Sequence, residues 1–153
     1  MKKVLGIVAL MMVMAVSALA VVSDSATVPV YLNVPEFVRL SVHPEDDGQF
    51  DLYFDPADPD STVEDTVSLL AEANVNYNVN FESINPVGNY GDLTNLISVS
   101  LDTTIDSNFG NPGNANLRAT AVFDTQGYFE LDNPVVLEES SQIAEVIFTI
   151  SAQ

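Results

Sequence analysis

Polar and apolar residues alternate strictly in the middle of this chain. Asparagine occupies every second position from Asn74 to Asn80. The other positions hold Val75, Tyr77, Val79 and Phe81. Successive side chains of a β-strand point to opposite faces, so this period of two predicts a half-buried strand with its asparagines outside the core. The alternation begins upstream at residue 62, and a single strand of that length would exceed roughly 60 Å, so we expect it to divide around residues 70–73.

Further alternating runs occur along the chain, with turn residues between them. They cover residues 26–42, 49–54, 96–101, 117–123, 128–131 and 143–152. Pro35 interrupts the first run, residues 124–127 have the composition of a hairpin turn, and no amphipathic helix is evident. The pattern predicts an all-β fold, a single immunoglobulin-like antiparallel β-sandwich of about seven to nine strands. A closed barrel is the alternative, and Pro29 and Pro35 suit the open edges of a sandwich better.

The parity of these runs predicts which side chains are buried. The expected core is Val30, Leu32, Leu40, Val67, Val75, Tyr77, Val79, Phe81, Val99, Ala121, Phe123, Phe148 and Ile150. With Phe81 in that core, a Phe81→Ala substitution is expected to cost about 3 to 5 kcal/mol. The four asparagines of the central stripe, Asn74, Asn76, Asn78 and Asn80, should lie on the opposite face. The pattern allows three interpretations of these asparagines: they face solvent, they bind a neighbouring strand, or they contact another subunit.

The first twenty residues have the pattern of a secretory signal peptide. Lys2 and Lys3 precede an apolar run that ends in Ala18-Leu19-Ala20. The run is short for a membrane span, which favours a cleaved signal over an uncleaved anchor. We therefore predict a signal peptide at residues 1–20, one domain at residues 21–153, secretion to the cell surface or medium, and no membrane span after cleavage.

The predicted mature chain is strongly acidic. Two arginines, Arg39 and Arg118, oppose 22 acidic residues, so the formal charge is 2 − 22 = −20. A polyanion would be repelled, which excludes nucleic acid as a partner. The chain has no cysteine, so it must fold without disulfides.

Two stretches resemble a known class of domain. The first is a Val-rich run that directly follows the signal and ends in Pro35, and the second is the run at residues 72–79. Both resemble parts of spore-coat-U-like and fimbrial-type β-sandwiches of bacterial surfaces. The resemblance covers about a third of the chain and departs from that class in lacking cysteine. It implies an immunoglobulin-like sandwich that assembles on the cell surface by strand donation.

Little in the sequence suggests catalysis. The predicted mature chain has one histidine, His43, no cysteine and no lysine, and it contains none of the common nucleophile, phosphate-loop or zinc-protease motifs. His43 reads more simply as an exposed turn residue than as a ligand. A glycosidase is disfavoured because the acids cluster in polar loops and no tryptophan is present to support a sugar. We predict that the protein is not an enzyme.

Calcium is the best candidate for a bound ligand. Its oxygen ligands could come from a proline-stiffened acidic loop. The candidate ligands are Asp55, Asp58, Asp60, Glu64 and Asp65, with Asp46, Asp47 and Asp51 as a second set. Neither set has EF-hand spacing, and the alternative is a solvated acidic loop that keeps the protein soluble.

The first alternating run is a candidate assembly strand. Val28, Val30, Leu32 and Val34 lie on one face of an edge strand whose Pro29 limits pairing on one side. Such a strand can pair within its own domain or complete the sheet of a neighbour. We predict a secreted structural protein of a bacterial cell surface or extracellular filament that associates with itself. The alternative is a monomeric module that binds calcium or carbohydrate.

Overall fold

The computed structural model describes residues 26–55, 57, 62–132 and 141–153. The predicted signal peptide lies outside them. The chain divides into two units, Met1–Val34 and Pro35–Gln153. In the first unit, residues 26–34 form neither helix nor strand, and the second unit holds all of the regular structure.

The second unit is mostly β-structure, which confirms the predicted all-β class. Its described residues form six strands and two short helices. The strands are β1 (Val38–Val42), β2 (Val63–Ala73), β3 (Tyr77–Pro86), β4 (Ile97–Asp102), β5 (Gly113–Phe123) and β6 (Ala144–Ala152). The helices are α2 (Gly91–Thr94) and α3 (Thr125–Phe129).

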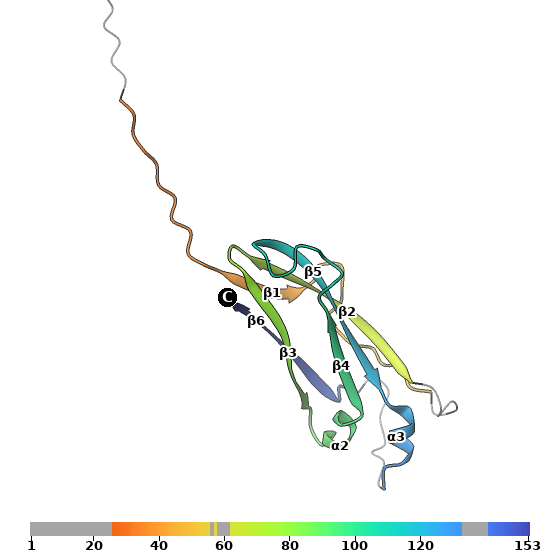
Figure 1. The fold of residues 1–153 in the computed structure, drawn as a ribbon. Helices are drawn as coiled ribbons and strands as arrows, with labels where there is room; N and C mark the ends of the chain where they lie inside the picture. Colours follow the sequence, from red (N-terminus) through yellow and green to blue (C-terminus); the bar gives the residue numbers. More distant parts are fainter. Residues whose placement is uncertain (1–25, 56, 58–61, 133–140) are drawn as a thin grey trace, which may run out of the picture. The chain divides into compact units, whose positions relative to one another are not determined.

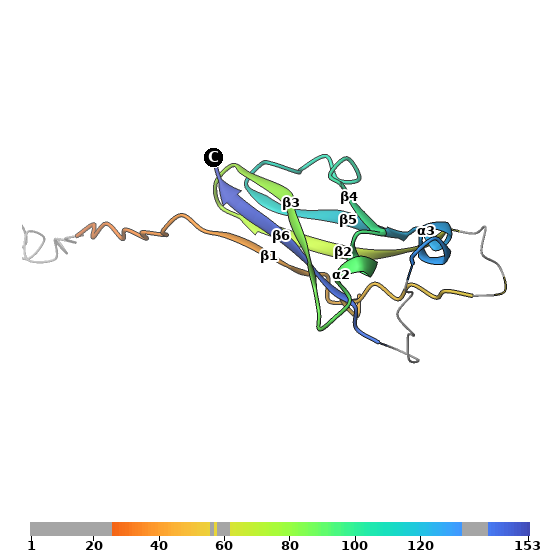
Figure 2. The same ribbon diagram turned by 90° about the horizontal axis from the view of Figure 1, so that it is seen from below.

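The strands form two antiparallel sheets (Figure 1). One has four strands in the order β1-β2-β5-β4, and the other pairs β3 with β6. The two central strands of the larger sheet, β2 and β5, pair over their full length from Val63↔Phe123 to Ala73↔Gly113. In Figure 2, as in Figure 1, β3 and β6 run side by side. The prediction of seven to nine strands stays a prediction for the whole chain.

One hydrophobic core draws on both sheets. Every second residue is buried from Val67 to Ala73 in β2 and from Ala115 to Phe123 in β5, as the period of two requires. The buried cluster is Val67, Leu69, Ala71, Ala73, Tyr77, Val79, Ala115, Leu117 and Ala119. Val38, Leu40, Phe148 and Ile150 pack against it from β1 and β6. The parity predicted for the middle of the chain is therefore confirmed for β2 and for the start of β3.

Three residues of the predicted core are exposed instead. Val30 and Leu32 are almost fully exposed because the segment that carries them pairs with no described strand. Phe81 is 39% exposed. Its ring packs edge-on against Phe148, with the centroids 6.2 Å apart, but the closed part of the core ends at Val79. The remaining predicted core residues are buried or half-buried.

The asparagine run is not one unbroken strand. β2 ends at Ala73 and β3 begins at Tyr77, so residues 74–76 form the connection between the two sheets. The division comes just after the region where the length argument predicts it. The Asn74 side chain accepts a hydrogen bond from the Phe37 amide at 2.8 Å and donates one to the Pro35 carbonyl at 2.9 Å. Asn74 thus fixes the entry of the chain into β1, and only Asn78 and Asn80 lie on the outer face of a strand.

A helix replaces one predicted hairpin. Residues 124–127 do not turn the chain into a strand, because Asp124 caps the N-terminus of α3 and its carboxylate accepts from the Gly127 amide at 3.0 Å. Aspartate and glycine are common to turns and to helix caps, so composition alone does not distinguish the two. Residues 49–54 also form no ladder, although Phe54 packs against Phe123 and Tyr128 as the predicted parity requires.

Candidate functional site

The N-terminal segment, residues 26–34, carries four exposed aliphatic side chains and pairs with no strand of the described chain. The side chains predicted to serve assembly are Val28, Val30, Leu32 and Val34, which are 78, 92, 85 and 58% exposed. Burying one aliphatic side chain of this size stabilises a protein by roughly 1.5–3 kcal/mol. Four of them at alternate positions have the form of a β-strand that lacks the sheet to which it would add.

The two-stranded sheet offers the complementary feature, a strand with an unpaired edge. β3 pairs with β6 from Tyr77↔Ala152 to Pro86↔Ala144, with an irregularity between Phe81 and Ser83. Within the described residues, neither strand pairs with a second neighbour. Phe81 and Ile147 leave large apolar surfaces partly exposed on this sheet. The alternating pattern of residues 144–152 predicts a strand and does not by itself indicate an interaction site, although the stretch is long and has one charge and no proline.

The residues predicted to bind calcium are only partly within the described chain. Asp58 and Asp60 lie outside it. Glu64 and Asp65 are consecutive positions of β2, so their side chains point to opposite faces of the sheet. The Asp65 carboxylate accepts from the Asp51 amide at 2.7 Å, and that of Asp55 accepts from the Ala57 amide at 2.8 Å.

The described residues contain no group of three or more acidic, histidine or cysteine side chains arranged to hold a metal ion. Calcium binding by the acidic loop stays a prediction. Of the second set, Asp46 accepts from the Ser68 amide at 2.8 Å and Asp47 accepts from the Gln49 amide at 3.1 Å.

Two aspartates extend the larger sheet at points where an edge strand ends. β1 pairs with β2 as far as Val42↔Leu69, and the next amide of β2, that of Ser68, donates to Asp46. On the other side, β4 ends opposite Arg118, and the amide of Asn116 donates to Asp106 at 3.0 Å. Each carboxylate satisfies a backbone N–H that the missing strand would otherwise bind.

These hydrogen bonds perturb the aspartates themselves. The amides of Ser68 and Gly48 lower the pKa of Asp46 below its ordinary value, and those of Asn116 and Asn108 lower the pKa of Asp106. Donation to a carboxylate favours its charged form. Asp46 and Asp106 therefore have a structural role beside the larger sheet.

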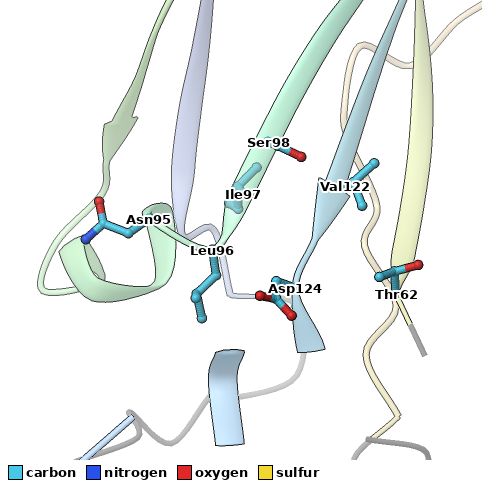
Figure 3. Close-up of a pocket in the computed structure, with 7 residues that line it drawn as sticks. All are labelled: Thr62, Asn95, Leu96, Ile97, Ser98, Val122 and Asp124. Carbon is cyan, nitrogen blue, oxygen red and sulfur yellow. The ribbon is translucent and has the colours of Figure 1, made fainter. Parts of the chain in front are cut away.

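Two hollows of the described chain contain few groups suited to chemistry. One hollow of about 290 Å³ lies beside the start of β4 (Figure 3). Asp124 is the single carboxylate in its lining, and that carboxylate already caps α3. A second hollow, of about 380 Å³, includes His43, Asp46 and Arg118. There the Asp46 carboxylate is bound to the sheet and the His43 Nδ1 accepts from the Glu45 amide at 3.3 Å.

Comparison with known proteins adds no relative. No model of a protein family matches the chain, and neither the curated proteins nor the solved structures include a match. The resemblance to spore-coat-U-like and fimbrial-type domains therefore stays a prediction. Among the described residues, no helix has the length and apolar character needed to cross a membrane.

Proposed function

We propose that this chain is a secreted, non-enzymatic structural protein of a bacterial cell surface or extracellular filament, and that it assembles by exchange of its N-terminal segment. The observation that carries the proposal is the set of four exposed aliphatic side chains at alternate positions of residues 26–34. Contact of such an apolar surface with water is unfavourable. In an assembly it would be buried against a neighbouring copy.

Three further features support the proposal. Two antiparallel sheets share one core, as in an immunoglobulin-like sandwich. Among the described residues, no strand pairs with the outer edges of the smaller sheet, so these edges can accept a strand. The N-terminal pattern of a signal peptide indicates export, and an exported protein without cysteine gains stability from contacts between subunits.

Matched charge substitutions test the proposal in the predicted mature chain, residues 21–153. Val30→Asp with Leu32→Asp places two charges on the apolar face, whereas Tyr31→Asp with Asn33→Asp places two on the polar face. We expect light scattering after size-exclusion chromatography to find multimers for the parent chain and the second variant, and monomers for the first. A parent chain that is monomeric at every concentration would contradict the proposal.

Light scattering together with thermal unfolding, each with and without calcium, tests the alternative, a monomeric binding module. A monomer whose melting temperature rises with millimolar calcium would favour that alternative, because a ligand that binds only the folded state stabilises it. Asp58→Asn with Asp60→Asn should then abolish the rise. An unchanged melting temperature would leave the loop as a solvated acidic segment.

A further inference from the structure

The free edge of β6, which faces away from β3, is the least protected edge in the described chain. β6 has nine residues, no proline and a single charge, at Glu145. The other exposed edges each carry a device that hinders pairing. β3 has an irregularity after Phe81 and ends in Pro86, β4 has six residues, and β1 has five with a charge at Arg39.

β1 does not close this edge. It contacts β6 but pairs with β2, and its five residues are too few to cover the nine of β6. Lysine, the commonest guard of natural sheet edges, is absent from the chain after Lys3. The edge therefore keeps a row of backbone groups that another strand could bind.

The N-terminal segment is built to pair along one of its own edges only. Alternate residues of a strand direct their backbone N–H and C=O groups to opposite edges. Pro29 and Pro35 both occupy odd positions, so both missing N–H groups fall on the same edge. The even residues Val28, Val30 and Leu32 keep their N–H groups on the other edge, with their side chains on one face.

We propose that the free edge of β6 accepts the N-terminal segment of a second copy of this chain, with the even-numbered residues of that segment paired to it. This inference rests on the proposed function. The segment and β6 each have nine residues with apolar side chains at alternate positions, so the added strand extends the core-facing surface of Val146, Phe148 and Ile150. Its outer edge carries Pro29, and Pro35 follows directly after the segment with its missing N–H on the same side.

This arrangement determines the geometry of assembly. Each copy gives one segment and receives another through a different surface, so the contact is heterologous and continues from copy to copy. Because Pro29 and the adjacent Pro35 hinder pairing along the outer edge of the added strand, we expect the two-stranded sheet to grow by one strand and no further. The expected assembly is therefore a chain of linked domains and not a growing sheet of stacked strands.

Disulfide trapping between two populations of the predicted mature chain tests the acceptor. The chain has no cysteine, so each introduced thiol is unique. One population, with one affinity tag, carries Tyr31→Cys or Asn33→Cys on the outer face of the segment. The other, with a second tag, carries Ile147→Cys or Thr149→Cys on the outer face of β6. After mixing and mild oxidation, we expect a doubly tagged dimer on a non-reducing gel for at least one of the four pairs.

The controls carry Asn80→Cys on β3, which pairs with Thr149, or Ser100→Cys on β4. A segment on the free edge of β6 lies two strand spacings from β3, roughly 9.5 Å, which is beyond the reach of a disulfide. Trapping at Asn80 or Ser100 instead of β6, in chains that still assemble, would overturn the acceptor and leave strand exchange standing. Chains that do not assemble at all would overturn both.

Discussion

The N-terminal segment and β2 have the same sequence pattern and opposite surroundings. In both, aliphatic side chains recur at every second position. Val67 and Leu69 on β2 are buried in the hydrophobic core, whereas Val30 and Leu32 are almost fully exposed. Alternation therefore establishes that a stretch can form a half-buried strand, but it does not identify the strand or the molecule that covers it.

The largest expected effect compares two phenylalanines on opposite sides of the buried boundary. Phe123 is buried and Phe81 is 39% exposed. Phe123→Ala should cost about 3–5 kcal/mol of unfolding free energy. Phe81→Ala should cost only about 1–2 kcal/mol, because it loses one aromatic contact and part of its burial. Urea unfolding of both variants measures the difference, and equal losses would mean that Phe81 is covered in solution.

A second pair compares two leucines from the two regions. Leu117→Ala removes a fully buried side chain of β5 and should cost about 2–5 kcal/mol. Leu32→Ala should change the stability of a dilute, monomeric sample by less than about 0.5 kcal/mol, because the side chain is 85% exposed. At assembling concentrations, Leu32→Ala should weaken association while Leu117→Ala retains it at temperatures where the domain stays folded. A large loss for Leu32→Ala in the monomer would indicate that the segment folds onto its own domain.

A smaller effect is expected at the connection between the sheets. Asn74→Ala removes two hydrogen bonds that hold residues 35–37 and should cost about 1–3 kcal/mol. Asn76→Ala is the matched control, because the Asn76 side chain is exposed and forms no hydrogen bond within the described residues. Thermal unfolding of the two variants compares them. If they are equally stable, the Asn74 side chain does not anchor the start of β1.

The smallest effect depends on pH. Hydrogen bonds from Ser68 and Gly48 lower the pKa of Asp46 in the folded state, so this carboxylate stabilises the fold above its unfolded pKa. That contribution is lost as the pH falls through the lowered pKa. Asp46→Asn should slightly reduce the melting temperature at pH 7, and the difference should shrink as the pH falls below the ordinary aspartate pKa and disappear below the lowered pKa of Asp46.

Glu45→Gln removes a neighbouring charge whose carboxylate accepts no hydrogen bond from the described residues, and it should change the melting temperature little at either pH. A gap between Asp46→Asn and the parent chain that persists in acid would show that the charge is not the stabilising feature.

Several parts of the fold could be predicted from the sequence because they depend on period and chain length. The all-β class, the strands around β2, β4, β5 and β6, and the buried parity of Val67, Tyr77 and Phe123 follow from side chains that alternate between core and solvent. The candidate assembly residues were also evident, since four aliphatic side chains share one face of a proline-bounded segment. Composition likewise showed that the acids outnumber any cations that could pair with them.

Other parts were decided by contacts between residues distant in the sequence. Whether Asn74 continues a strand or ends one depends on Phe37 and Pro35, which lie far back along the chain. Asp124 caps a helix because α3 packs its aromatic rings against Phe54, a contact that no local pattern encodes. Which strand edge stays unpaired, and so where a second copy could bind, follows from the pairing order of all the strands. The sequence by itself determined the faces of each strand, and only the tertiary structure determined their neighbours, because pairing joins backbone groups that are alike in every residue except proline.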